Sequence, residues 1–188
     1  MSIQRCLICG MIVNHKNMRL NEEGMLNKNE ADIINSCPFC GVDKTYMLLS
    51  DDEAEETKDI ENLDNITIKI LDHAMKLEVF NSEFYGQAAI LAKDDKNKKM
   101  FTALSKIELI HAKVHQRIAG YKMLPAITTI DYSKYNDDNI LLNQAALREA
   151  HAVSYYKKHC ENLCSNYIKI VFEALCKVEE EHIALTAL

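Results

Sequence analysis

The sequence predicts a mainly helical protein, in which a four-helix bundle follows a small cysteine-rich, metal-binding segment. Three observations lead to this prediction. The 188 residues are 48% hydrophobic and include only five Gly and two Pro, which favours helices around a core over loops or disorder. Apolar residues recur at three- and four-residue spacing from about residue 62 onward. Four of the seven cysteines lie in residues 1–50, ahead of an acidic stretch at 51–61 that we expect to be a solvated linker.

The composition also argues against several classes of function. A net charge of −6 with no basic cluster makes nucleic-acid binding unlikely on electrostatic grounds. No apolar run approaches the roughly 20 residues needed to span a bilayer, and the start lacks the apolar region of a secretory signal. We therefore expect a cytoplasmic protein without membrane contact, whose cysteines are metal ligands or buried thiols rather than disulfides. The buried thiols would be Cys160, Cys164 and Cys176, which lack ligand spacing.

The predicted first domain, residues 1–50, contains two Cys-x2-Cys pairs. Cys6 and Cys9 precede Gly10, Cys37 and Cys40 precede Gly41, and 27 residues separate the pairs. Four thiolates in this spacing suit a tetrahedral metal, and a glycine after each pair permits a tight turn. Iron sites and structural zinc ribbons share the layout, so one iron or one zinc ion remains open.

The predicted second domain, residues 62–188, contains four helices, at about 62–93, 97–121, 138–164 and 166–187. The first two and the last two are joined by short turns, whereas the middle connection at 122–137 is long and contains Pro125. Short, long and short connections are typical of a bundle with one crossover, as in ferritin-like folds. On the second helix, Glu108 and His111 fall on the apolar side, while Arg117 falls on the opposite, polar side.

An internal repeat identifies the candidate ligands of this bundle. When the chain is shifted by 71 residues against itself, positions 78–111 give nine identities in 34, where roughly 6% identity per position would give about two. Each half then contains Glu-x6-Tyr on one helix and Glu-x2-His on the next. The matched pairs that carry chemistry are Glu78/Glu149, Tyr85/Tyr156, Glu108/Glu179 and His111/His182.

These residues have the composition of a di-iron carboxylate site. Residues three apart on a helix share a face, so Glu108 with His111, and Glu179 with His182, can reach one site. One further Glu comes from each of the other two helices, which completes the ligand set of a di-iron bundle. Four carboxylates in a core could not all stay ionised without cations, and two divalent ions balance their charge. Oxygen and nitrogen ligands favour two iron ions over zinc, although manganese also suits them.

Three further residues lie near this predicted site. Tyr85 and Tyr156 stand almost two turns after their Glu on the same face, and we expect them to donate hydrogen bonds to ligand carboxylates. Plain core tyrosines are the alternative. His115 lies one turn beyond His111, and a direct metal role for it is the less favoured interpretation.

Both parts of the chain resemble the rubrerythrin family. Cys-x2-Cys-Gly followed by Cys-Pro-x-Cys-Gly resembles rubredoxin, and the six Glu and His residues resemble the rubrerythrin di-iron site. The rubredoxin-like part comes first, as in reverse rubrerythrins. Two features depart from the pattern: Ala152 replaces an additional Glu that is often found on the third helix, and Met11 replaces an aromatic residue after the first knuckle.

The resemblance implies a peroxidase that reduces hydrogen peroxide to water. Its catalytic residues would be the six ligands with Tyr85 and Tyr156, and its electrons would arrive through the N-terminal iron. It further implies an NAD(P)H-dependent reductase or rubredoxin as electron donor, and a homodimer. Two alternatives stay open: a non-enzymatic module that senses or binds O2 or iron and has a structural zinc knuckle, and a ferroxidase-type iron oxidase.

Overall fold

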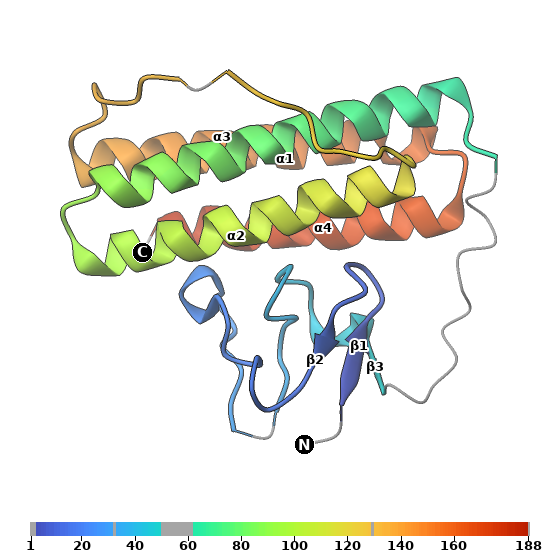
Figure 1. The fold of residues 1–188 in the computed structure, drawn as a ribbon, viewed down its shortest axis with the longest axis horizontal. Helices are drawn as coiled ribbons and strands as arrows, with labels where there is room; N and C mark the ends of the chain where they lie inside the picture. The colour runs from blue at the N-terminus through green and yellow to red at the C-terminus, as the bar shows by residue number, and fades with distance from the viewer. Residues whose placement is uncertain (1–2, 32, 50–61, 129, 188) are drawn as a thin grey trace.

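A computed structural model of the protein describes residues 3–31, 33–49, 62–128 and 130–187. Four long helices run side by side above a small cysteine-rich segment (Figure 1), which confirms the predicted mainly helical fold class. The helices are α1 (Asn65–Leu91), α2 (Asp95–Ile118), α3 (Asp138–His159) and α4 (Asn166–Thr186). The acidic stretch that we predicted to be a linker, 51–61, lies outside the described residues.

Aspartates placed at the helix starts define where the helices begin. The side chain of Asp64 accepts a hydrogen bond from the Thr67 amide and starts α1. Asp94 and Asp137 cap α2 and α3 in the same way. Such caps satisfy amide groups that the first helical turn leaves unpaired. At its other end α2 stops at Ile118, and Gly120 follows two residues later with a φ of 72°, which suits a helix-ending glycine.

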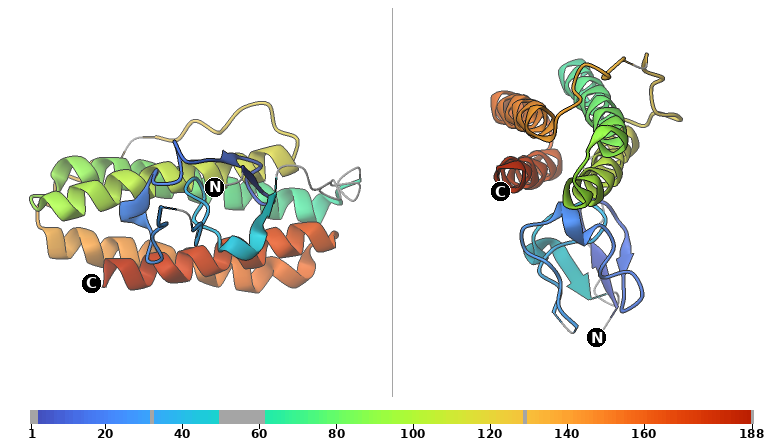
Figure 2. Two further views of the ribbon diagram at one scale, coloured as in Figure 1. Left: turned by 90° about the horizontal axis from the view of Figure 1, so that it is seen from below. Right: turned by 90° about the vertical axis from the view of Figure 1, so that its left-hand side faces the viewer.

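The helices form two antiparallel pairs joined by the predicted long crossover. α1 packs mainly on α2, and α3 packs mainly on α4. The connection from α2 to α3 runs along the outside of the bundle, so that α3 begins at the end of the bundle opposite to the one where α2 ends (Figure 2). There the carboxylate of Asp138, at the start of α3, accepts hydrogen bonds from the amides of Lys93 and Asp94 in the α1–α2 turn. The crossover therefore ends at a fixed point beside that turn.

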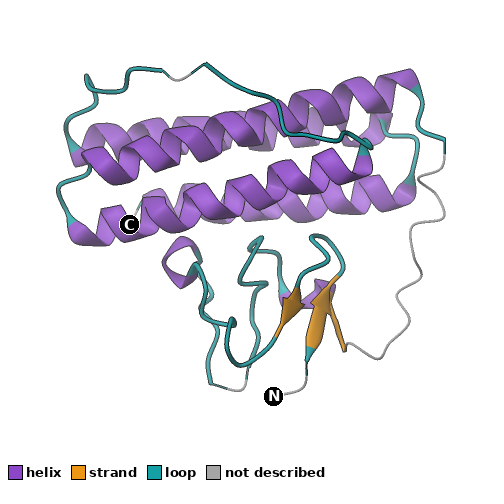
Figure 3. Ribbon diagram, in the orientation of Figure 1, coloured by secondary structure: helices purple, strands orange, loops and turns teal. Residues whose placement is uncertain are grey.

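The cysteine-rich segment contains a small antiparallel sheet and one long loop (Figure 3). The strands are β1 (Gln4–Cys6), β2 (Ile12–Val13) and β3 (Met47–Leu49), and β1 lies between the other two. The buried side chain of Asn29 orders the loop, because its amide donates to the carbonyls of Met18 and Ser36 and its oxygen accepts from the amides of Asn35 and Ser36. Four hydrogen bonds from one buried side chain thus hold Met18, Asn35 and Ser36 of this loop together.

The cysteine-rich segment packs directly on α2 and α4. A Cβ atom built on Gly24 would lie 2.9 Å from Ile107 Cδ1 of α2, and one on Gly41 would lie 2.8 Å from Val178 Cγ1 of α4. The residues of both parts share one buried apolar cluster, here called the shared core. It includes all four knuckle cysteines and apolar residues of all four helices. The two parts therefore fold against each other rather than as separate bodies.

A second buried apolar cluster, the distal core, fills the other end of the bundle. On α1, residues 70–74 belong to the shared core and residues 84–88 to the distal core, with Glu78 between them. On α2 the order is reversed, and Glu108 and His111 again lie between the two cores. The polar residues that the repeat identified are thus enclosed by apolar residues at both ends.

The remaining cysteines follow the prediction only in part. Cys176 is buried and Cys160 is half-buried, but Cys164 is exposed. The expectation of a buried thiol was wrong for Cys164 because α3 ends at His159, five residues before the predicted end, and a short turn carries Cys164 to the surface. No helix in the described ranges is long and apolar enough to cross a membrane.

Candidate metal centres

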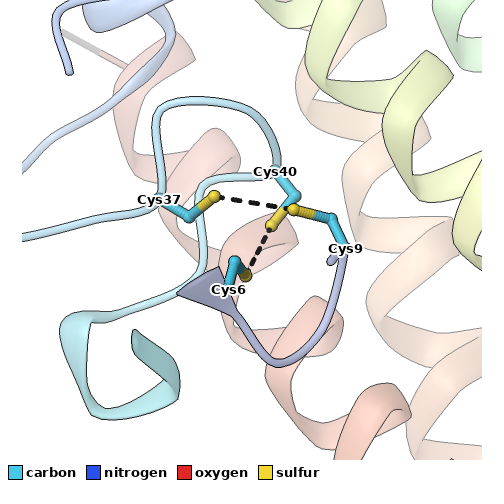
Figure 4. A group of neighbouring side chains, drawn as sticks. All are labelled: Cys6, Cys9, Cys37 and Cys40. Carbon is cyan, nitrogen blue, oxygen red and sulfur yellow. Dashed lines mark hydrogen bonds between the residues drawn. The ribbon is translucent and has the colours of Figure 1, made fainter. Parts of the chain in front are cut away.

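The first candidate centre is formed by the four knuckle cysteines, which all point toward one point (Figure 4). Their sulfur atoms lie within 4.8 Å of one another, and all four residues are buried. The closest pairs are Cys6 with Cys40 and Cys9 with Cys37, both at 3.7 Å between Sγ atoms. Four thiols at these distances and without disulfides match the donor set of a tetrahedral iron or zinc site.

Each knuckle is built by the same backbone turn. The Gly10 amide donates to the Cys6 carbonyl at 2.8 Å, and the Gly41 amide donates to the Cys37 carbonyl at 2.9 Å. Both glycines have positive φ, 78° and 77°, a conformation that other residues rarely adopt. The glycine after each pair therefore closes the turn that brings its two cysteines together.

Mutual hydrogen bonding makes this centre suited to a cation. The neighbouring thiols, Cys37 first, lower the pKa of the Cys6 thiol well below its usual value, because they donate hydrogen bonds to its thiolate. Burial raises the pKa of Cys40 well above its usual value, and hydrogen bonds and the Cys6 charge act in the same direction. A thiol must lose its proton to bind a metal, and a divalent ion at this point would favour the thiolate form of its ligands.

The second candidate centre lies in the bundle and consists of two overlapping groups of donors. Position A is formed by Glu78, Glu108, His111 and Glu179, and position B by Glu108, Glu149, Glu179 and His182. The donor atoms of each group lie within 4.8 Å of one another, and every residue is buried. The fold thus brings together all six Glu and His residues that the repeat identified, with Glu108 and Glu179 common to both groups.

The two shared carboxylates lie between the two histidines. Each of them places one oxygen near His111 Nδ1 and the other near His182 Nδ1. For Glu108 these distances are 3.1 and 3.0 Å, and for Glu179 they are 3.0 and 2.9 Å. The imidazole rings are nearly parallel, with centroids 6.3 Å apart. Two carboxylates with one oxygen directed to each side are the arrangement that bridges a pair of metal ions.

Burial gives these acids and bases strongly shifted pKa values. Burial raises the pKa of Glu78 well above its usual value and that of Glu149 to about 8, and the charges of Glu108 and Glu179 add to the effect. Burial alone would lower the pKa of His182, but the neighbouring carboxylates outweigh it and raise that pKa well above its usual value. In the absence of cations, protons must therefore compensate the carboxylate charge.

The donor set fits two metal ions. The Oε2 atoms of Glu78 and Glu149 are buried and have no hydrogen-bond partner among the described residues. A buried carboxylate oxygen without a partner costs about 1–3 kcal/mol or more, and a cation at each position would satisfy it. Divalent ions would also replace the protons at the shifted groups, since metal ligands bind in their deprotonated form.

Two tyrosines cross-connect the halves of the bundle. Tyr85 of α1 donates its hydroxyl hydrogen bond to Glu149 Oε1 of α3, and Tyr156 of α3 donates to Glu78 Oε1 of α1. Both tyrosines are buried, so each hydroxyl has its partner away from water. His115 belongs to neither metal position: its Nε2 atom lies 2.8 Å from the Tyr156 hydroxyl.

A direct hydrogen bond joins the two candidate centres. His111 Nε2 lies 2.8 Å from the carbonyl oxygen of Cys40, which accepts its N–H. Since Nε2 carries the proton of this bond, Nδ1 would be left to bind a metal ion at position A. Sequence patterns did not indicate this contact, because 71 residues separate the two partners.

Arg117 makes a second contact between the helical bundle and the cysteine-rich segment that the sequence did not indicate. We placed it on the polar side of α2, and its side chain is indeed exposed. However, the first knuckle covers that side, and the guanidinium donates to the carbonyls of Ile8 and Cys9 at 2.7 and 2.9 Å. Helical periodicity can place a residue on a face, but it cannot tell what packs there.

Comparison with known proteins agrees with this description of the bundle. The model of the ferritin-like domain family matches residues 66–187, which covers all four helices and both metal positions. No curated protein and no solved structure matches the chain. Because the match extends over more than half of the sequence, the chain belongs to the ferritin-like domain family.

Proposed function

We propose that the protein is a rubrerythrin-like, non-haem di-iron peroxidase that reduces hydrogen peroxide to water. The observation that carries this proposal is the hydrogen bond between His111 and the Cys40 carbonyl, which links a candidate ligand of one centre to a candidate ligand of the other. A structural zinc knuckle does not require such a link, whereas a one-electron relay benefits from a short covalent and hydrogen-bonded path. The buried donor set of the bundle supports the di-iron part of the proposal.

The reaction requires two electrons and two protons: H2O2 + 2 e− + 2 H+ → 2 H2O. A pair of ferrous ions would supply the two electrons that break the O–O bond. The protein residues have three tasks. Glu108 and Glu179 hold the two positions at a fixed separation, the two tyrosines orient Glu78 and Glu149, and the apolar cores at both ends exclude bulk water.

The cysteine centre would return the electrons one at a time. An NAD(P)H-dependent reductase or rubredoxin would reduce the iron held by the four cysteines, and the Cys40–His111 contact would pass each electron to the bundle. The direct packing of the knuckles on α2 and α4 supports this route within one chain. The homodimer that the family resemblance implies stays a prediction.

Metal analysis of single variants tests the bundle site. Roughly two iron ions per chain should be bound there, and Glu108→Ala or Glu179→Ala should each cause a large loss, because each residue serves both positions. Glu180→Ala is the matched control, since this neighbour is exposed and pairs with Lys157 at the surface. Full occupancy in both ligand variants would contradict the di-iron assignment.

Replacement of Cys9 and Cys40 by Ser tests the relay. The variant should stop multiple turnover with a reductase as donor, because electrons can no longer enter through the knuckles. A single turnover should persist when the bundle is first reduced chemically. Loss of the single turnover as well would show that the knuckles are needed for the reaction or the fold rather than for electron supply.

The choice of oxidant separates a peroxidase from a ferroxidase. Peroxide accepts two electrons at one O–O single bond, whereas reduction of O2 to water needs four, twice what two ferrous ions supply. We expect the anaerobically reduced protein to be oxidised by stoichiometric hydrogen peroxide at least about tenfold faster than by O2, roughly 1.4 kcal/mol of barrier. Equal rates, or faster oxidation by O2, would move the assignment to an oxygen-reactive or ferroxidase role.

A further inference from the structure

We propose that His115 is a positioning residue that makes the two metal positions unequal, so that position A binds its metal ion more tightly than position B. The inference rests on the proposed di-iron site and goes beyond it, because nothing in the duplicated ligand set distinguishes the two positions. Position A is defined by Glu78 and His111, and position B by Glu149 and His182.

His115 begins a hydrogen-bonded chain that ends at a ligand of position A. Its Nε2 atom lies 2.8 Å from the Tyr156 hydroxyl oxygen, and that hydroxyl contacts Glu78 Oε1. With a cation at position A, Glu78 would be ionised and could only accept. The hydroxyl proton then goes to Glu78, and His115 must donate its own N–H to the tyrosine oxygen. A hydroxyl that accepts one hydrogen bond becomes a stronger donor of the next, by about 10–30%.

Packing holds this chain in one geometry. His115 is fully buried, and Phe172 contacts its ring edge-on at a centroid distance of 5.4 Å. The same phenylalanine meets the Tyr156 ring at 5.0 Å and 90°. Burial also lowers the pKa of His115 to about 3, which keeps the imidazole in the neutral form with a single N–H.

The other half of the repeat has no matching hydrogen-bonded chain among the described residues. The 71-residue shift matches His115 with Thr186, whose hydroxyl donates to the carbonyls of its own helix, at His182 and Ile183. Tyr85 donates to Glu149 as its counterpart donates to Glu78, but no further hydrogen bond to the Tyr85 hydroxyl occurs in the part of the chain that the structure describes. Apart from the candidate ligands themselves, Glu149 is therefore oriented by one residue where Glu78 is oriented by two.

The histidine ligands differ in the same direction. His111 Nε2 is fixed by the Cys40 carbonyl, whereas His182 Nε2 is buried without a hydrogen-bond partner among the described residues. Both the carboxylate and the imidazole of position A thus have one supporting partner more than their counterparts at position B. Removal of such outer partners typically weakens metal binding by about 10–100-fold.

The buried imidazole of His115 is itself destabilising, which supports a functional reason for a histidine at this position. His115 Nδ1 is buried and has no hydrogen-bond partner in the described ranges. An unpartnered buried polar atom is destabilising, and an apolar side chain would avoid that cost. His115→Leu should consequently fold, which makes it a usable variant.

Stepwise iron binding tests the inference. The full-length protein, with zinc in the cysteine centre and a metal-free bundle, would be titrated anaerobically with 57Fe(II). Chelator competition gives the two binding constants, and Mössbauer spectra at one and two equivalents show which signal appears first. For the unmodified protein we expect the first constant to exceed the second by at least about tenfold, with one dominant quadrupole doublet at one equivalent.

The variants separate positioning from general structure. His115→Leu should lower the first constant by about tenfold and leave the second unchanged, while His115→Gln, which keeps a side-chain N–H donor, should restore most of the loss. Thr186→Val, at the matched position, should change neither constant. In a Tyr156→Phe background, substitution of His115 should have no further effect, because the chain to Glu78 is already broken.

Three results would overturn the inference: unchanged constants in His115→Leu, an equal fall of both constants, or a Gln variant that behaves like Leu. Circular dichroism and urea denaturation of each variant would show whether the fold is retained. If the unmodified bundle binds no iron at all, the di-iron proposal fails first, and the inference fails with it.

Discussion

Substitution of Gly41 by Ala should destabilise the protein through a strained backbone conformation and a steric contact between the second knuckle and α4. The glycine has a φ of 77°, and a Cβ atom added to it would lie 2.8 Å from Val178 Cγ1. Carbon atoms do not approach that closely, so either the knuckle or α4 must move. Both belong to the shared core, where little free space is available.

Two contributions make up the expected loss. An alanine with positive φ costs about 1–2 kcal/mol, and the lower entropy of the unfolded chain returns about 0.4–1 kcal/mol. The steric contact with Val178 adds about 1–3 kcal/mol, as is usual for an overfilled core. The free energy of unfolding should therefore fall by about 1–5 kcal/mol in Gly41→Ala, with the middle of the range at about 3 kcal/mol.

Gly120 provides a matched control for the conformational part. It has a φ of 72°, yet a Cβ atom there would meet nothing within 4 Å. Gly120→Ala should therefore lose only about 1 kcal/mol. Combining Gly41→Ala with Val178→Ala, which removes the contacting methyl groups, should cost about 1–3 kcal/mol less than the sum of the two single changes.

Urea denaturation of all four variants at equal metal content would measure these differences. The reasoning fails if Gly41→Ala is no more destabilising than Gly120→Ala. It also fails if the double variant is additive within about 0.5 kcal/mol, since two residues in contact should not be independent.

Further predictions concern protonation, docking and thiol reactivity. The pKa of Glu149 in the metal-free bundle is raised to about 8, so its protonated form stabilises the fold at low pH and this contribution is lost as the pH rises toward 8. His115, with its pKa lowered to about 3, acts in the opposite direction only below about pH 6.5. A metal ion kept in the cysteine centre removes the opposing contribution of Cys6, whose pKa is lowered in the metal-free state. With the cysteine centre loaded and the bundle metal-free, the melting temperature should consequently fall between pH 6.5 and 8, and with iron in the bundle it should not. A rise with the metal-free bundle would contradict the shift. Arg117→Gln should cost about 1–3 kcal/mol in urea denaturation, because both of its hydrogen bonds hold the first knuckle on α2; an unchanged midpoint would show that they are dispensable. Cys164 should be the first cysteine labelled by a thiol reagent in the folded, metal-loaded protein, and mass spectrometry that finds a knuckle cysteine labelled first would refute the described exposure.

Residue periodicity and the internal repeat were sufficient to predict the bundle and to select the residues that line its centre. They succeed because a helix places residues three and four apart on one side, and because a duplicated Glu and His pattern is improbable without a shared purpose. They could not predict that His111 contacts Cys40, that Arg117 holds the first knuckle, or that His115 reaches Tyr156. Each of these contacts joins segments far apart in the chain, and the choice of partner depends on how whole elements pack.

Because α2 and α4 cover the cysteine centre but are synthesised after it, the four thiols can meet metal ions before the shared core is complete. Cys6 to Cys40 leave the ribosome well before α2 and α4, which later cover them, have been made. At about 5–20 residues per second, roughly seven to thirty seconds pass between Cys40 and Val178. During that interval the four thiols can bind whichever thiolate-binding metal ion is available, and α2 and α4 then pack over the occupied site. We therefore expect the metal in the cysteine centre to follow the supply of iron or zinc during growth rather than the equilibrium preference of the finished site. Metal analysis of protein from iron-rich and zinc-rich cultures would test this, and identical contents in both would contradict it.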